Sequence, residues 1–294
     1  MERSREAALS ADRPPAAPPK KSALPKDNDK FSKIYVTMYK KYTKEDFLKY
    51  LNFKDDYGVQ GVLYYGAIRK KKHRQELEDT LKSLGYEVSY EVIQESGFYE
   101  NVIVLNIGGK KIWYGTSYGG AYLSEVLHLA CLLGSKKNIL LGSCGGLSKN
   151  GTVGDIVLAN ASYGNESTTR MYQPDNEEFT YFPDEDLTNN IKTRINKKYR
   201  VIEGKIMTCQ AAMMESWEDV LRWSDEGYVG VEMESSTFFA VSKYFSVPSA
   251  AMVFIVDNLI KNETLMDEKV QNLKQYFQEV KTELFRVALE ELLT

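Results

Sequence analysis

A short apolar segment that ends in two carboxylates constrains this chain more than any other feature. Residues 228–233 form an apolar run with one charge, Glu232, and residues 236–244 have the spacing of a helix with one apolar face. Glu232 and Glu234 therefore lie at a predicted strand-to-helix junction. In open α/β sheets such junctions form the ligand crevice, where a carboxylate can accept hydrogen bonds from sugar hydroxyls. The alternative is that Glu234 caps the first turn of the helix, where the helix dipole favours an anion.

Three further segments are predicted to be buried strands. Residues 138–141 run into the small-residue turn GSCGG, residues 154–159 (GDIVLA) follow, and residues 250–256 form an apolar strand that ends at Asp257. Strands alternate with helices along the chain, and there is no internal repeat. We expect a three-layer α/β fold in which helices flank a mixed, strongly twisted central sheet.

The remaining elements follow from hydrophobic spacing. Gly108-Gly109 is a hairpin signal between two strands. The last predicted helix carries an apolar stripe that we assign to the core: Leu273, Phe277, Val280, Leu284 and Val287. The other expected strands cover residues 60–65, 87–93, 102–107 and 111–114, and the other expected helices cover residues 43–51, 69–84, 119–133 and 267–293.

Composition agrees with a soluble enzyme. The chain has 294 residues, 43% hydrophobic content and a net charge of −3, which suits one sizeable α/β core and gives no nucleic-acid footprint. The basic run at residues 69–74 precedes acidic residues, as on a solvated helix face. Three cysteines without metal or redox spacing favour a reducing cytosol. We expect no metal, no membrane partner and a cytoplasmic location.

The beginning of the chain has a different composition. Residues 1–30 contain five prolines and mixed charges without an apolar stretch, so they resemble neither a secretory signal nor a membrane anchor. We expect a disordered leader over residues 1–30 and a single domain over residues 31–294. A transit peptide is a less favoured alternative, because Glu2, Glu6 and Asp12 are unusual in one.

The segments GSCGG, GDIV and GVEMES, in this order and followed by Asp257, resemble the nucleoside phosphorylase and nucleosidase superfamily from about Val59 to the C-terminus. This group includes purine nucleoside phosphorylase, uridine phosphorylase and methylthioadenosine nucleosidase. The resemblance implies cleavage of an N-glycosidic bond, with Asp257 as the acid that protonates a purine N7. It also implies that Glu234 binds the ribose hydroxyls, Met233 packs under the sugar and Glu232 lies near the base. Asp257 follows an apolar strand, which should raise its pKa, although a strand-ending turn residue is the alternative.

Phosphate is the expected co-substrate, and no other cofactor is expected. Ser143, with the N–H groups of Gly145 and Gly146, offers donors to an anion if the GSCGG segment is a turn. Arg69 matches the arginine of the GDPxR segment of phosphorylases. The second phosphate arginine of the group is replaced by Leu140, and we expect Arg170 as a substitute.

The expected base pocket also departs from the group. Ala212 stands where purine enzymes place an aromatic residue, so Met213 is expected as an adaptable wall and Gln210 as an amide that binds a base edge. Tyr118 lies in the segment that matches the loop beside the sugar and phosphate. We expect a homo-oligomeric nucleoside phosphorylase of purine salvage, a dimer or hexamer, that releases free base and pentose 1-phosphate. Hydrolysis by water, pyrimidine specificity and a non-catalytic nucleoside-binding role stay open as alternatives.

Overall fold

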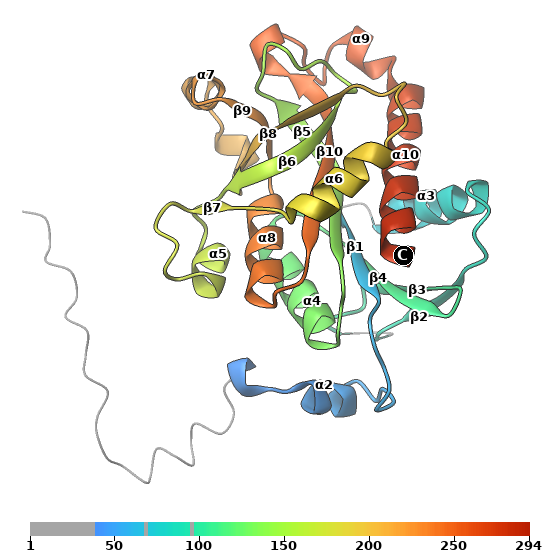
Figure 1. Ribbon diagram of the computed structural model, residues 1–294. Helices are drawn as coiled ribbons and strands as arrows, with labels where there is room; N and C mark the ends of the chain where they lie inside the picture. The colour runs from blue at the N-terminus through green and yellow to red at the C-terminus, as the bar shows by residue number, and fades with distance from the viewer. Residues whose placement is uncertain (1–38, 68–69, 95–96) are drawn as a thin grey trace, which may run out of the picture. The chain divides into compact units, whose positions relative to one another are not determined.

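The computed structural model describes residues 39–67, 70–94 and 97–294, with the backbone alone over residues 70–73. The chain divides into two compact units, residues 1–42 and residues 43–294. The described part of the first unit holds the short 3-10 helix η2 (Tyr39–Lys41). The second unit is an α/β domain (Figure 1). Arg69 lies outside the described residues.

One ten-stranded mixed sheet forms the centre of this domain, in the order β10-β6-β8-β9-β5-β1-β4-β3-β2, with β7 paired to β6. Pairs such as β1 with β4 and β5 with β10 are parallel, whereas β2 with β3 and β3 with β4 are antiparallel. The mixed sheet that the sequence predicts is therefore confirmed. The strands are β1 (Gly61–Gly66), β2 (Ser89–Val92), β3 (Ile103–Ile107), β4 (Lys110–Ser117), β5 (Asn138–Gly146), β6 (Ile156–Tyr163), β7 (Thr180–Tyr181), β8 (Val201–Thr208), β9 (Tyr228–Glu232) and β10 (Ser249–Asn258).

Strand β5 changes its partner along its length. Its first four residues pair with β1, its last two, Gly145 and Gly146, pair with β9, and β10 follows its other edge throughout. Strand β10 also pairs with β6, β6 pairs with β8, and β8 pairs with β9. Because β9 and β10 both pair with β5, these five strands form a closed circuit. The turn predicted for GSCGG is therefore wrong: these small residues continue the strand, since glycines let β9 and β10 approach β5 from both sides.

Helices cover both faces of the sheet (Figure 1). Along β1, Val62 and Tyr64 enter the core beneath α4 and α8, whereas Leu63 and Tyr65 enter the core beneath α3, α6 and α10. This alternation with both faces buried confirms the three-layer architecture. The helices are α2 (Lys44–Tyr50), α3 (Lys70–Ser83), α4 (Gly120–Leu132), α5 (Ser167–Tyr172), α6 (Glu185–Arg194), α7 (Trp217–Asp225), α8 (Ser235–Tyr244), α9 (Glu268–Gln271) and α10 (Lys274–Leu293), with the 3-10 helices η3 (Ala212–Met214) and η4 (Leu259–Lys261).

The C-terminal helix differs from the prediction in one respect. The expected helix over residues 267–293 is divided, because α9 ends at Gln271 with Asn272 as its C-cap, and α10 starts after Leu273. Asn has a weak helix propensity, which favours a break at this point. Val280, Leu284 and Val287 are fully buried and Phe277 is partly buried against the core, so the predicted core stripe is confirmed there, whereas Leu273 lies before α10 and is not part of the core. Among the described residues, no helix is long and apolar enough to cross a membrane.

Candidate active site

The C-terminal ends of β1, β4, β5 and β10 meet beside the end of β9. Strands β1, β4, β5 and β10 are parallel, so their last residues share one edge of the sheet. Gly145 on β5 is in register with Val231 on one side and Asp257 on the other. The GVEMES segment and Asp257 are thereby placed on either side of the end of β5, as expected for a crevice at a topological switch point.

Glu234 is 6% exposed and lies where three of these elements converge. Its Oε1 accepts a hydrogen bond of 2.6 Å from the N–H of Gly119. Its Oε2 lies so close to Gly66 that a Cβ there would be 2.5 Å away, so a larger residue at the end of β1 would displace this carboxyl. Burial, and then the negative charge of Glu232, raise the pKa of this carboxyl. Glu234 occupies the N-cap position of α8, as the capping alternative expects, but its side chain makes no cap hydrogen bond.

Glu232 fills the capping role instead. Its carboxylate accepts bonds of 2.8 Å from the N–H groups of Glu234 and Ser235, and bonds of 2.6–2.7 Å from the hydroxyls of Ser235 and Thr208. Thr208 in turn accepts from the N–H of Ser236 at 3.1 Å. Burial raises the pKa of Glu232 against these four bonds, which favour the ionised form. Its role near the base stays a prediction, while its role in fixing the junction is plain.

Asp257 lies in β10 directly after a bulge at Val256. Such bulges re-aim side chains near functional sites. A Cβ on Gly145 would lie 3.2 Å from its Oδ1, which places the carboxyl over the end of β5. Burial raises the pKa of Asp257 to about 6. No hydrogen bond or ion pair joins its side chain to another described residue, so the Asx-turn alternative has no bond to support it.

Gln210 ties two parts of the site together. Its Nε2 donates to the carbonyl of Met233 at 2.8 Å, and its Oε1 accepts from the N–H of Gly120 at 3.2 Å. The amide thus joins the GVEMES segment to the start of α4, a role that the sequence did not indicate. Tyr118, next to this link, is 55% exposed, and Met213 on η3 is 96% exposed. Contact of Tyr118, Met213 and Gln210 with a substrate stays a prediction.

The expected phosphate residues are less well assembled. Ser143 is exposed on β5, in the stretch that neither β1 nor β9 covers. Gly145 lies within the sheet between β9 and β10, so the argument from a turn with free N–H groups does not apply to it. Arg170 is exposed on α5, and no contact joins it to Ser143 within the described residues. Leu140 is buried in the core, where a cation has no place.

Several supporting residues were missed in the sequence. Thr208, Ser235 and Ser162 form a buried hydroxyl cluster beneath Glu232, and the hydroxyls of Ser236 and Thr237 donate to Glu166. The run Ser235-Ser236-Thr237 at a predicted helix start was the available signal, because hydroxyl residues favour helix N-termini. Glu215 was also missed; burial, with a smaller effect from the charge of Asp257, raises its pKa.

Comparison with known proteins agrees with this geometry. The sequence profile described as the phosphorylase superfamily matches residues 74–293. A guanosine phosphorylase of Halorubrum lacusprofundi is 30% identical over 120 residues, 40% of this chain and 49% of the relative. A purine nucleoside phosphorylase of the DeoD type from Clostridium novyi is 27% identical over 131 residues, 44% and 56% of the two chains. One from Bacillus cereus is 23% identical over 153 residues, which are 51% of this chain and 63% of the relative. The chain thus spans about half to under two thirds of these relatives.

Proposed function

Since this chain belongs to the phosphorylase superfamily, we propose that it is a pentosyltransferase that cleaves the N-glycosidic bond of nucleosides with phosphate. The products are the free base and pentose 1-phosphate. The observation that carries the proposal is the placement of two carboxyls with raised pKa, Glu234 and Asp257, beside the end of β5. Phosphate is the co-substrate, and no further cofactor enters the reaction.

In the proposed mechanism, Asp257 acts on the base. As the bond from C1′ to the base nitrogen breaks, its electron pair moves into the base, and the proton of the Asp257 carboxyl passes to N7 of a purine. A phosphate oxygen forms the new bond to C1′, and Asp257 is left ionised. A pKa of about 6 keeps the proton transferable near neutral pH.

Glu234 acts on the sugar. The Gly119 N–H binds one of its oxygens, and the other lies against Gly66 in a buried position, so the carboxyl is positioned before substrate arrives. Such a preorganised group can bind the ribose hydroxyls without reordering in the transition state. Glu232 and Gln210 hold the segment that carries Glu234.

Purine nucleosides are the proposed substrates. The relatives are named guanosine and purine nucleoside phosphorylases, and Asp257 supplies a proton donor suited to N7. Hydrolysis is the second candidate, because buried Leu140 stands where the group has a phosphate arginine. We further propose a cytoplasmic enzyme of purine salvage that works as a homo-oligomer.

A substrate panel tests the proposal. Inosine, guanosine, adenosine and uridine are incubated with and without phosphate, and base and sugar 1-phosphate are measured by chromatography. We expect phosphate-dependent release of purine bases. Equal release without phosphate would establish the nucleosidase, faster release of uracil would overturn purine specificity, and no release from any nucleoside would favour a binding protein.

A further inference from the structure

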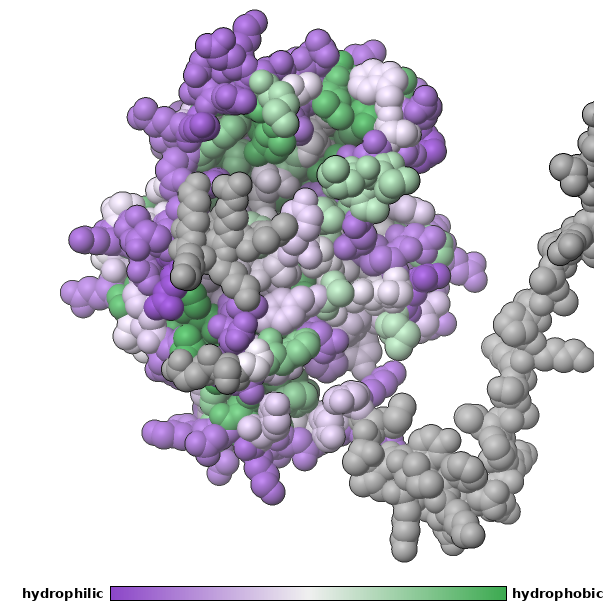
Figure 2. Space-filling view, turned by 180° about the vertical axis from the view of Figure 1, so that it is seen from behind, coloured by the Kyte–Doolittle hydropathy of each residue, from purple (hydrophilic) through white to green (hydrophobic). Residues whose placement is uncertain are grey.

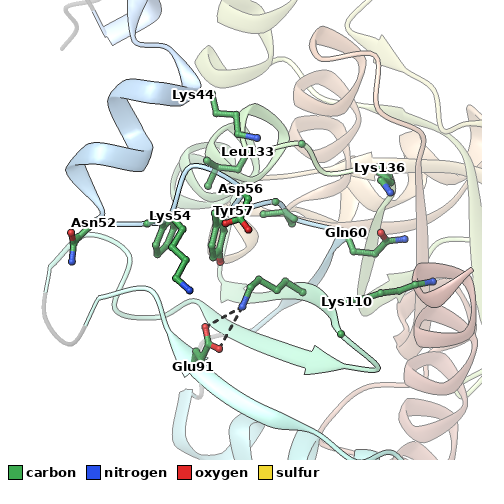
Figure 3. Close-up of a pocket in the computed structure, with 16 residues that line it drawn as sticks. Lys44, Asn52, Lys54, Asp56, Tyr57, Gln60, Glu91, Lys110, Leu133 and Lys136 are labelled. Atoms are coloured by element: carbon green, nitrogen blue, oxygen red, sulfur yellow. Dashed lines mark hydrogen bonds and ion pairs between the residues drawn. The ribbon is translucent and has the colours of Figure 1, made fainter.

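A cavity lies near the N-terminal ends of β1 and β4, opposite the C-terminal strand ends that form the candidate active site. It has a volume of about 770 Å³ and includes Gln60, next to the start of β1, and Lys110, the start of β4 (Figure 3). Strands β1 and β4 run from here to Gly66 and Ser117, beside the segment that holds Glu234. The two places therefore lie at opposite ends of β1 and β4, which run side by side.

Lysines dominate the charge of this cavity. Five lysines and two carboxylates line it, although the whole chain has a net charge of −3. Figure 3 shows Lys44, Lys54, Lys110, Lys136 and Glu91 around Asp56 and Tyr57 at the centre of the view. The charged lining residues are Lys44, Lys54, Lys110, Lys111, Lys136, Asp56 and Glu91.

Three of the five ammonium groups make no hydrogen bond or ion pair with another described residue. Lys111 pairs with Glu91 at 3.4 Å, and Lys110 donates to the carbonyl of Leu293. Within the described residues, the ammonium groups of Lys44, Lys54 and Lys136 form no hydrogen bond or ion pair, not even with the nearby carboxylates of Glu45, Asp55 and Asp56. Positive charges gathered without partners repel one another, and a bound anion would relieve that repulsion.

Packed aromatic side chains form one wall of the cavity. The rings of Phe53 and Tyr57 stack at 3.9 Å and 12°, and the Tyr57 hydroxyl accepts a 3.0 Å bond from the indole of Trp113. The volume lies in the range of small-molecule sites. Lysines act as adaptable point charges toward phosphate groups, whereas an extended nucleic acid needs a basic stripe rather than a confined hollow.

We propose that this cavity binds a small oligophosphate anion, supplied either as the triphosphate of a nucleotide or as an inorganic polyphosphate. Several linked phosphates match several separate ammonium groups better than one phosphate does. Binding here is independent of the reaction proposed for the other edge of the sheet.

Calorimetric titration of the full chain with ATP, tripolyphosphate and orthophosphate, in metal-free buffer at low and high salt, tests the proposal. We expect ATP and tripolyphosphate to bind in the micromolar range, more weakly at high salt, and orthophosphate to bind far less. Tighter binding of ATP than of tripolyphosphate would identify a nucleotide as the source, and equal binding a polyphosphate. No binding of either at millimolar concentration would overturn the proposal.

Two triple variants locate the site. Lys44→Gln/Lys54→Gln/Lys136→Gln should weaken ATP and tripolyphosphate binding at least about tenfold, because each charge-assisted contact is lost. The control Lys197→Gln/Lys243→Gln/Lys274→Gln removes the same charge from exposed positions elsewhere and should bind normally. Equal affinity of both triple variants would place the anion elsewhere and overturn the proposal. If the first variant melts early, Lys54→Glu alone should still weaken binding several-fold while Lys243→Glu does not.

Discussion

Burial of Asp257 favours its protonated form, which is the form that can donate a proton to the base. Asp257→Asn keeps the shape of the side chain and removes the proton, so purine cleavage should fall by about two to four orders of magnitude, which steady-state kinetics will show. In the wild-type protein, activity should decline as pH rises through about 6, because the acid becomes ionised. The variant should lack that decline. Unchanged turnover in Asp257→Asn would show that the carboxyl is not the acid.

The same substitution should stabilise the protein. The pKa of Asp257 is about 6 in the folded state and about 4 in the unfolded state, so the unfolded state loses this proton more readily. The free energy of unfolding therefore falls as pH rises from about 4 to about 6. Asp257→Asn should therefore raise the free energy of unfolding at pH 7.5 by on the order of 1–2 kcal/mol, allowing for partial exposure, and change little at pH 4. Urea denaturation at both pH values measures this. A variant that is less stable at pH 7.5 would mean that the carboxylate has a favourable partner.

Glu232 and Glu234 should respond oppositely to truncation. Glu232→Ala removes the acceptor of four hydrogen bonds. It leaves the buried N–H groups of Glu234 and Ser235 unpaired, while the hydroxyls of Ser235 and Thr208 keep partners in the hydroxyl cluster, so it should cost about 2–4 kcal/mol of stability. Glu234→Ala releases the Gly119 N–H but also removes a carboxyl whose pKa is raised by burial and by the charge of Glu232, so it should lower stability by no more than about 1 kcal/mol while removing most turnover of ribonucleosides. Thermal melts and kinetics on both variants give the comparison. The order reversed in either measurement would contradict these roles.

At the level of the elements, the sequence predicted the strands and helices with strong periodicity but not their irregularities. The apolar runs in β1, β5 and β10 were recognisable because both faces are buried. The bulge at Val256 and the partner change of β5 were not, since both depend on strands that are distant from each other in the sequence. Glycines in GSCGG favour a turn locally, and only the approach of β9 and β10 makes them a strand.

Gln210 gives a prediction about a link between elements. Gln210→Ala removes both hydrogen bonds by which the Gln210 side chain links the backbone of Met233, just after β9, to that of Gly120 at the start of α4. It should therefore raise KM for nucleosides about tenfold and increase hydrogen exchange over residues 117–122 and 208–216. Gln278→Ala, on the exposed side of α10, is the matched control. A raised KM without increased exchange would show that Gln210 binds the base directly, as the sequence suggested.

At the level of the whole molecule, the site has acids but few cations. Arg170 neighbours exposed apolar side chains: Met171 is 80% exposed, and Tyr244, 45% exposed, contacts Tyr172 of the same helix as Arg170. Exposed apolar side chains that lie together can form part of a protein interface. We expect self-association through this surface, which would allow Arg170 to complete the phosphate site of a neighbouring copy.

Light scattering and mixing test this assembly. The wild-type chain should be a dimer or larger, and Met171→Glu should dissociate it and lower activity. Mixed oligomers of Arg170→Ala and Asp257→Asn chains should regain activity if Arg170 acts across the interface. A monomer with full phosphate-dependent activity would rule this out.

The closed circuit of strands also has a consequence for synthesis of the chain. Strand β5 leaves the ribosome more than a hundred residues before β10, its main partner, and β6 likewise waits for β10. Until residue 258 has emerged, both strands have unpaired backbone edges that can pair with other chains. We therefore expect nascent chains arrested at residue 248 to be sensitive to protease and prone to aggregate, and chains that extend to residue 294 to be protected. Protection at the shorter length would mean that the circuit can close in another order.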